Sequence, residues 1–397
     1  MKKILVLGAA QSCVGIIKKV KQLGYKSVVV GNSSDLPGKQ YADYYLIAED
    51  NDVESVVSYC KKIGVDGIVP VPVDRPLVWM SIVAEKLGLI FISPEVAHNF
   101  RHKYKMKQCL QRVGIKCAKG ILTSREIFST NLISEILFPM IIKPIDGYAS
   151  RGVIRVNTLK ELESSIPEVI SFSSDSLFII EEFIAGREFN AEGVCYNGDV
   201  EIYAIVEKIR DPFPRTIEMG HIVPPDITET EEKIIVDTIS KAVVSLGMEN
   251  GAFNAEIMIR NGEGYVIEVN GRLAGDFIVS HLLRPTTGQD MEEAVINISL
   301  GIPPEKAKRN YKKHGMISFF NLPEGKIISK IKDFSHLEKN KNIVWTYLFF
   351  KEGDKLPEVL HMGHRSGFVI VLADSRKDML ELSENTKKTI IDSVEFV

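Results

Sequence analysis

Short apolar runs and longer amphipathic segments alternate over residues 1–95. Continuous apolar runs typical of buried strands occupy residues 3–7, 28–30 and 66–71. Segments with the spacing of an amphipathic helix follow them at residues 16–23, 53–63 and 77–87. This alternation predicts a small parallel sheet with helices on its faces. Loops at the carboxyl ends of such strands, including residues 73–76, are a common place for a ligand site.

The glycines after the first strand do not form a dinucleotide-binding motif. Gly8 and Gly15 lack the GxGxxG spacing, and the second strand is followed by Gly31 and Asn32 where that motif has an acidic residue. A tight turn between strand and helix explains these glycines better than bound NAD does.

The most informative pattern is a β-hairpin over residues 251–272. Alternating apolar runs at 253–259 and 265–269 flank a glycine-containing turn, residues 261–264. Oxygen-bearing side chains interrupt both strands of this hairpin. They are Glu256 in the first strand, and Glu268 and Asn270 in the second.

The spacing of these three residues predicts a metal site. Glu268 and Asn270 are two residues apart, so both side chains leave the same face of the strand. An acidic residue on a strand usually marks a solvated face, but the apolar flanks predict burial, and a buried carboxylate needs a cation or a partner. Oxygen donors of this kind suit Mg²⁺. Arg272 projects to the same side if the strand continues.

A lysine and a small-residue turn form a second candidate site. A basic amphipathic helix over residues 101–113 carries Lys103, and Lys143 lies near the end of a strand, residues 138–144. The turn that follows contains small residues that leave backbone N–H groups accessible: Gly147, Ser150 and Gly152. Such a turn can close over phosphates while the lysine supplies positive charge. It is not a Walker loop, and a plain hairpin explains it when it is read alone.

The next apolar strand, residues 177–184, contains two acids, Glu181 and Glu182. Backbone groups from Glu182 through Phe183 to Ile184, flanked by apolar side chains, are suited to clamp a flat adenine. Glu188, after a turn, is placed to accept hydrogen bonds from ribose hydroxyls. A connector with solvated acids explains this stretch equally well.

A proline-containing loop over residues 210–215 precedes a compact polar segment, residues 218–225, also read as a loop. Glu218 and His221 in this segment are candidates for contacting substrate. Helices are expected over residues 228–246, 275–281 and 290–300. The remainder shows a further α+β pattern without recognisable chemistry.

Composition narrows the class of protein. The chain has 397 residues and a net charge of −3, which argues against a nucleic-acid binder that works by neutralising phosphates. It has no apolar run long enough to span a membrane. The five cysteines lack CxxC spacing and are typical of reduced thiols. We expect a cytoplasmic protein that binds neither nucleic acid nor membrane.

Taken in this order, the motifs resemble the ATP-grasp superfamily of carboxylate–amine ligases over nearly the whole chain. The resemblance implies an α/β and α+β fold. A small parallel-sheet α/β domain precedes an ATP-grasp fold, whose two α+β subdomains hold ATP between two sheets, and a C-terminal α+β extension follows. The expected domains are 1–95, 96–190 (lid subdomain with its leading helix), 191–305 (large subdomain) and 306–397.

The resemblance also assigns roles to individual residues. Lys103 and Lys143 would contact ATP phosphates, and residues 147–152 would form the lid. Adenine would be held by Glu181 and the backbone of residues 182–184, and ribose by Glu188. Two Mg²⁺ ions, replaceable by Mn²⁺, would bind Glu256, Glu268 and Asn270. Arg272 would steady the acyl-phosphate. Substrate would contact four residues: Glu218, His221, Gly275 and Asp276.

Within the superfamily, the chain most resembles the L-amino-acid (dipeptide) ligases and carnosine-synthase-like enzymes. The residues that carry this resemblance are 268–278, Thr287-Gly288, and Glu218 to His221 followed by Pro224-Pro225. The chain departs from the pattern at Gly271, where proline is common, and at His102, where an acid is usual.

The leading hypothesis is therefore an ATP-dependent ligase that joins a small carboxylate, an amino acid, to an amine through an acyl-phosphate. An alternative is a ligase of nucleotide, cofactor or specialised-metabolite synthesis with another substrate. A third is a catalytically inactive nucleotide-binding regulator, against which the complete set of Glu256, Glu268, Asn270 and Arg272 argues. A homodimer is an expectation from the family alone.

Overall fold

The computed structural model describes residues 1–211 and 216–397, which form two compact units, each built from separate stretches of the chain. The first unit contains Met1–Cys117, Asn190–Ile205 and Ile227–Asn310. The second contains Ala118–Phe189, Val206–Asp226 and Tyr311–Val397. The four consecutive domains expected from the sequence stay a prediction. The loop expected at residues 210–215 falls largely on residues 212–215, outside the described residues.

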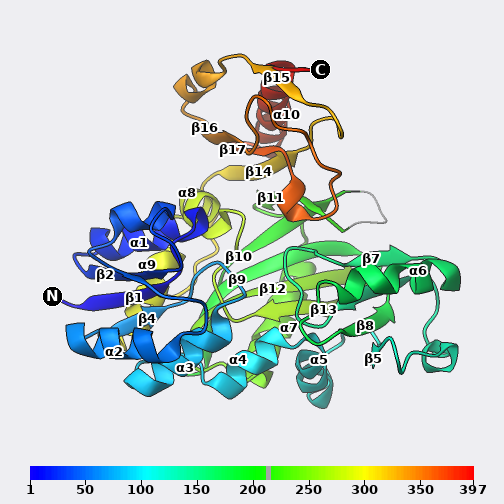
Figure 1. Ribbon diagram of the computed structural model, residues 1–397, viewed down its shortest axis with the longest axis horizontal. Coiled ribbons are helices and arrows are strands. Elements are labelled where there is room, and N and C mark those ends of the chain that lie inside the picture. Colours follow the sequence, from blue (N-terminus) through cyan, green and yellow to red (C-terminus); the bar gives the residue numbers. More distant parts are fainter. Residues whose placement is uncertain (212–215) are drawn as a thin grey trace. The chain divides into compact units, whose positions relative to one another are not determined.

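The first unit begins with a four-stranded parallel sheet in the order β3-β2-β1-β4. Its strands are β1 (Lys3–Leu7), β2 (Lys26–Gly31), β3 (Tyr44–Ile47) and β4 (Gly67–Val69). Figure 1 shows helices on both faces, α1 (Val14–Gln22) on one, and α2 (Val53–Ile63) and α3 (Leu77–Leu87) on the other. The predicted parallel sheet is confirmed. The sequence pattern missed β3, a short edge strand whose side chains are exposed or half-buried.

The rest of the first unit surrounds the predicted hairpin. Strands β12 (Gly251–Arg260) and β13 (Glu263–Asn270) form it, and the sheet order continues as β13-β12-β9-β10. Strands β9 (Arg187–Tyr196) and β10 (Asp199–Arg210) each belong partly to both units. Helix α7 (Glu229–Ser245) packs on β12 and β13 and starts at a capping box formed by Thr228 and Glu231.

The helix predicted over residues 101–113 starts later than expected. The chain forms α4 (Pro94–Arg101), turns at His102, and starts α5 (Lys103–Arg112). His102 has an extended backbone, with φ −101° and ψ 98°, and its imidazole Nδ1 accepts a hydrogen bond from the Lys105 N–H. A cap of this kind begins a new helix, so Lys103 lies in the first turn of α5.

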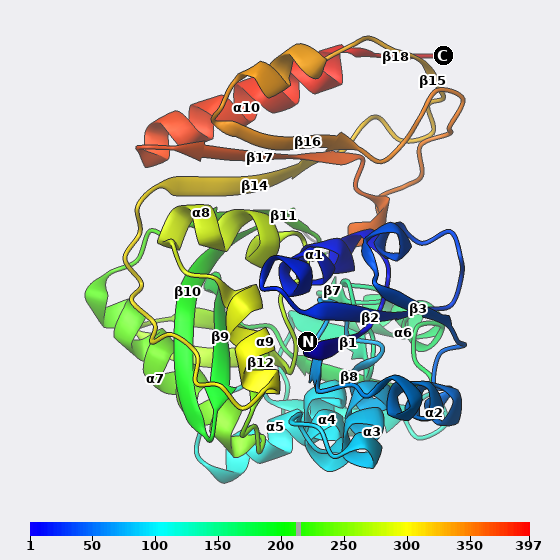
Figure 2. The same ribbon diagram turned by 90° about the vertical axis from the view of Figure 1, so that its left-hand side faces the viewer.

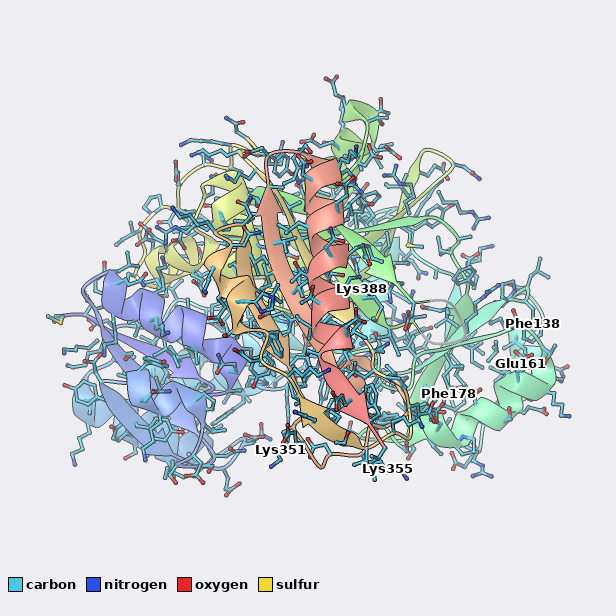
Figure 3. The ribbon with its side chains drawn as sticks, turned by 90° about the horizontal axis from the view of Figure 1, so that it is seen from above. Phe138, Glu161, Phe178, Lys351, Lys355 and Lys388 are labelled. Carbon is cyan, nitrogen blue, oxygen red and sulfur yellow. The ribbon has the colours of Figure 1, made fainter. Side chains whose placement is uncertain are left out.

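A four-stranded sheet opens the second unit, with strand order β5-β8-β6-β7. The strands are β5 (Gly120–Ser124), β6 (Met140–Pro144), β7 (Ile154–Val156) and β8 (Leu177–Glu182). Helix α6 (Leu159–Ile170) packs on β6, β7 and β8. Phe178, labelled in Figure 3, is fully buried in the core between them.

The second unit also contains an antiparallel sheet in the order β10-β11-β14-β17-β16. Its further strands are β11 (Glu218–Val223), β14 (His314–Phe320), β16 (Ile343–Leu348) and β17 (Gly367–Ala373). Helix α10 (Arg376–Asp392) covers β14 and β17, as Figure 2 shows, and an apolar core separates helix from sheet. The short strands β15 (Ile328–Ile331) and β18 (Val394–Phe396) pair with each other.

One segment read as a loop is a strand. Residues 218–223 form β11, in which His221 lies opposite Lys208 on β10 and Ile317 on β14. The polar residues suggested a solvated loop, but Glu218 and His221 are buried. Strand pairing and buried polar partners outweighed local sequence preference here.

Among the described residues, no helix combines the length and apolar character that crossing a bilayer requires.

We expect Ile390→Ala to lower the free energy of unfolding by about 2–5 kcal/mol, because it removes apolar contacts and leaves a cavity. Ile390 is fully buried between α10 and the sheet. The matched control is Leu380→Ala on the same helix, which is 37% exposed and should change stability by about 0.5 kcal/mol or less. Urea unfolding followed by circular dichroism measures both. Equal effects of the two substitutions would contradict the packing described.

Candidate functional site

The predicted metal ligands meet on the hairpin of the first unit. Glu256 lies directly opposite Glu268, and Asn254 lies opposite Asn270. The register shifts by one residue just after Glu256, a β-bulge of the kind that often re-aims side chains next to a functional site. Both glutamates are half-buried. Two carboxylates facing each other across a strand pair repel, so this arrangement favours a nearby positive charge.

Lys103 supplies part of that charge. Its Nζ lies 2.8 Å from Glu268 Oε1, and the lysine is only 5% exposed. The donor set also fits a hard divalent cation, because the carboxylates of Glu256 and Glu268 and the amide of Asn270 are all oxygen donors. The structure thus brings Lys103 to the predicted metal ligands within one unit.

Arg272 is held by a partner that the sequence analysis did not single out. Its Nε and Nη2 donate to the two carboxylate oxygens of Asp74, over 2.7 and 3.0 Å, and both side chains are largely buried. Asp74 lies in the loop between β4 and α3. Burial alone would raise the pKa of Asp74, but the charge of Arg272 outweighs it and lowers that pKa below its ordinary value.

Two further polar residues lie beside this pair. Asn254 Nδ2 donates to Glu192 Oε1 over 2.6 Å, and both residues are buried. Burial disfavours the charged form of Arg272, yet the charges of Asp74, Glu192 and Glu268 raise its pKa above the ordinary value. The guanidinium therefore stays charged at every physiological pH.

The segment after Arg272 departs from the helix predicted there. Asp276 and Phe277 have φ of 51° and 63°, in the left-handed region, and a π-helix then spans Ile278–Leu283. Such backbone is costly for residues other than glycine and is concentrated at functional sites. Gly275 and Asp276, the predicted substrate contacts in this unit, thus lie in a strained turn and not in a helix.

In the second unit, Lys143 and Glu181 form a buried ion pair. Their side chains come from the neighbouring strands β6 and β8, and Lys143 Nζ lies 2.5 Å from Glu181 Oε1. Their side chains are 6% and 5% exposed. The two residues expected to contact phosphate and adenine are therefore adjacent.

The predicted lid is a turn with left-handed backbone. Ala149, Ser150 and Gly152 have φ of 56°, 57° and 68°. A side chain at Gly147 would meet Pro144, since a Cβ there would lie 2.4 Å from its Cγ. Ser150 Oγ donates to the Thr216 carbonyl over 3.2 Å. The close approach of Pro144 explains Gly147, and the left-handed backbone explains Gly152.

Part of the expected adenine-binding backbone is engaged within the unit. The N–H of Glu182 donates to the Lys119 carbonyl over 2.9 Å, and the N–H of Phe183 donates to the Pro139 carbonyl over 3.2 Å. Lys119 N–H in turn donates to Glu182 Oε1. The adenine-binding role of residues 182–184 stays a prediction.

Glu188 lies in a buried ionic cluster with two cations that the sequence analysis missed. Arg210 contacts both oxygens of Glu188, and Lys208 Nζ lies 2.9 Å from Glu188 Oε1 and 2.7 Å from Glu218 Oε1. His221 Nε2 lies 3.6 Å from Glu218 Oε2. Burial opposes ionisation of Glu188, but Arg210 and Lys208 outweigh it and lower its pKa to about 2. Glu188, Glu218 and His221 are thus brought into one network.

Period-two spacing was the signal that would have found several of these partners. Lys208 and Arg210 alternate along β10, as Asn254 and Glu256 do along β12, so each pair shares a face of its strand. Nothing local marks Asp74 as the partner of Arg272, because 198 residues separate them.

Comparison with known proteins gives the same fold. The model of the ATP-grasp domain family matches residues 136–280, a region that includes every predicted site residue except Lys103. The chain is 28% identical over 276 residues to alanine–anticapsin ligase of Bacillus subtilis, covering 63% of this chain and 57% of that protein. It is 23% identical over 364 residues to the carbamoyl phosphate synthase large chain of Campylobacter jejuni, covering 84% of this chain and 32% of that one. The chain thus spans less than two thirds of these relatives.

Solved structures also resemble the whole chain. An L-amino acid ligase from Bacillus licheniformis superposes with a TM-score of 0.85 at 21% identity, covering 100% of this chain and 98% of that one. Phosphoribosylglycinamide synthetase from Anaerococcus prevotii gives a TM-score of 0.76 at 21% identity, covering 100% and 99%. These similarities show the ATP-grasp fold predicted from the motifs.

We expect Asp74→Asn to lower the free energy of unfolding at pH 7 by about 3–5 kcal/mol, because it leaves a buried guanidinium without its carboxylate. The folded pKa of Asp74 is depressed, so its pairing stabilises the wild type above the ordinary aspartate pKa, about 3.9. That contribution is lost as the pH falls through the folded pKa. The stability gap between wild type and variant should therefore be full at pH 7 and narrow below about pH 3.9.

Urea unfolding at several pH values measures this gap. Lys86→Gln is the matched control, because it removes an exposed ion pair with Glu54 and should cost about 0–1 kcal/mol at pH 7. A gap of the same size at pH 7 and pH 3, or one no larger than the control, would refute the role of Asp74.

Proposed function

We propose that this chain, whose residues 136–280 match the ATP-grasp domain family, is an ATP-dependent ligase that joins a carboxylate to an amine. The observation that carries the proposal is the pair of carboxylates Glu256 and Glu268, opposite each other on β12 and β13 with Asn270 beside them. Two like charges opposite each other repel. Lys103 offsets part of this repulsion, and Mg²⁺ bound with nucleotide phosphate would offset the rest.

Residues of the second unit would bind the nucleotide. Lys143 would lie against phosphate, where its positive charge balances the negative charge of the transferred group. Glu181 and the backbone of residues 182–184 would hold adenine, and Glu188 would accept from ribose hydroxyls. For Glu188 this requires sharing its oxygens with Arg210 and Lys208, which contact it here. The turn at residues 147–152 would cover the phosphates and exclude water.

The chemistry proceeds in two displacements. A carboxylate oxygen of the first substrate attacks the γ-phosphorus, the bond to the β–γ bridging oxygen breaks, and ADP leaves with the electron pair. The neutral amine of the second substrate then attacks the acyl carbon, the carbon–oxygen bond to phosphate breaks, and an amide forms with loss of a proton. Mg²⁺, when bound, supplies charge neutralisation at the phosphates.

Arg272 is suited to the second displacement. It is charged, largely buried and oriented by both oxygens of Asp74, so it offers a fixed positive charge to the oxygen of the acyl group, which becomes an oxyanion when the amine attacks the acyl carbon. Glu218, His221, Gly275 and Asp276 would contact the substrates. The names of alanine–anticapsin ligase and L-amino acid ligase support an amino acid as one substrate.

A second candidate function has the same two displacements but a different amine substrate. The similarity to phosphoribosylglycinamide synthetase over the whole chain supports a ligase of nucleotide synthesis that uses a phosphoribosylamine-type amine. The compound that raises ADP release separates the two candidates.

We expect ATP and Mg²⁺ to give amino-acid-dependent release of ADP and phosphate when all pairs of the twenty L-amino acids are supplied. The productive pair should yield a product with the mass of the dipeptide, which mass spectrometry detects. Release that responds only to a phosphoribosylamine-type amine would move the assignment to the second candidate. Magnesium-dependent ATP binding without release for any substrate would contradict ligase activity.

We expect Glu268→Ala and Lys143→Ala each to reduce ADP release at least about 100-fold, because each removes charge that the transition state needs. Glu263→Ala is the matched control, since Glu263 is an exposed acid on the same hairpin strand, paired at the surface with Lys116. It should leave the rate nearly unchanged. Circular dichroism checks that all three variants fold. A folded Glu268→Ala variant with near-normal turnover would refute the metal site.

A further inference from the structure

A pocket of about 330 Å³ lies at the carboxyl end of the N-terminal parallel sheet, wholly within the first unit. The ends of β1 and β2, the chain following β4, and the first turn of α3 line it. Carboxyl ends of parallel strands are the usual place for ligands in open α/β sheets. The roles proposed for the chain so far leave this pocket unused.

The interior of the pocket is uncharged. Its floor includes Leu7, Val30 and Val71, each no more than 2% exposed. Cys13 also lines it, and burial raises the pKa of this thiol to about 11, so it stays protonated. The single basic side chain among the lining residues is Arg75. An apolar interior of this size suits a compact apolar group and not a dinucleotide or a polyphosphate.

One polar group in the wall lacks a partner. Trp79, which lines the pocket, is 6% exposed, and its indole Nε1–H has no hydrogen-bond acceptor among the described residues. A buried donor without an acceptor is costly. This nitrogen has almost no accessible surface, so a ligand in the pocket would contact the apolar part of the indole and not its N–H.

Opposite charges lie together among the lining residues. Arg75 Nη2 is 3.2 Å from Asp50 Oδ2, and the side chains are 67% and 37% exposed. They are the more solvent-accessible part of the wall, whereas the floor is buried. A carboxylate and a guanidinium side by side complement a ligand that carries both an ammonium and a carboxylate.

We propose that this pocket binds an α-amino acid with an apolar side chain, as one of the two substrates of the ligase proposed above. The side chain fills the apolar floor beside the indole ring of Trp79, and the zwitterionic end pairs with Asp50 and Arg75. This inference rests on the proposed function for its link to catalysis. That link is short, because Val73 and Arg75 line the pocket and Asp74 between them holds Arg272.

Tryptophan fluorescence reads binding directly, because the chain contains two tryptophans, Trp79 and Trp345. In the full-length Trp345→Phe variant, Trp79 is the sole indole. Titration with L-leucine, L-methionine and L-phenylalanine should produce a saturable change in emission for at least one of them. The Trp79→Phe variant, which keeps Trp345, should give no change. Absence of any response in the Trp345→Phe variant, with no heat of binding by calorimetry, would overturn the proposal.

Analogues of leucine that lack one of its two charged groups test whether the pocket recognises both charges. For L-leucine as the probe, 3-methylbutylamine lacks the carboxylate and 4-methylpentanoate lacks the ammonium group. Both should bind at least tenfold more weakly than leucine. Arg75→Gln should weaken leucine binding about tenfold while leaving the weak binding of the amine unchanged. Equal affinity for leucine and both analogues would overturn the assignment of Asp50 and Arg75.

A blocking substitution tests the location. Ala10 lines the pocket and is exposed, so Ala10→Phe can fill its opening with little cost to folding. We expect a tenfold or greater loss of affinity by calorimetry. Lys86→Gln, an exposed change on the same helix as Trp79 but outside the lining, is the control and should bind normally.

Activity separates this inference from the proposed function. Amino-acid binding that Ala10→Phe abolishes, without ADP release for any substrate pair, would support the pocket and refute the ligase. Amino-acid-dependent ADP release whose KM is unchanged by Ala10→Phe and Arg75→Gln would support the ligase and refute the pocket. A tenfold rise in the KM of one amino acid, with the KM of ATP unchanged, supports both.

Discussion

Glu256 and Glu268 face each other across one strand pair, and their mutual repulsion requires positive charge beside them. Lys103 reaches Glu268 from the first turn of α5, and this is possible because the chain turns at His102 and starts a new helix there. A divalent cation fits the same oxygen donors. The hairpin geometry is thus the strongest argument for nucleotide chemistry.

The same constraint, that a buried charge needs a partner, recurs in each unit. Arg272 is oriented by Asp74 in the first unit, and Lys143 pairs with Glu181 in the second. In each pair the opposite charge offsets the cost of burial, and burial restricts the side chains, which is what catalysis by positioning and electrostatics demands. The buried ion pairs therefore contain the residues from which the proposed reaction needs preorganised charge.

Helices and strands were predictable from the sequence where apolar residues recur at a regular spacing. The alternation at the N-terminus predicted the parallel sheet, and the period of two around Glu256 and Glu268 predicted β12 and β13. The prediction was wrong where polar residues are buried, as in residues 218–223, which form a strand between β10 and β14. It was also wrong at Asp276, where left-handed backbone precedes a π-helix.

The sequence by itself determined which residues share a face and which chemical groups are available, because strand and helix periods are local. It placed Glu268 and Asn270 on one side of a strand without any knowledge of the fold. Only the tertiary structure decided their partners: Lys103 for Glu268, Asp74 for Arg272, and Arg210 with Lys208 for Glu188. The pocket beside Trp79 likewise exists only once separate strands end at one edge of a sheet. Contacts between residues far apart in the chain depend on how elements pack, and no local period encodes that.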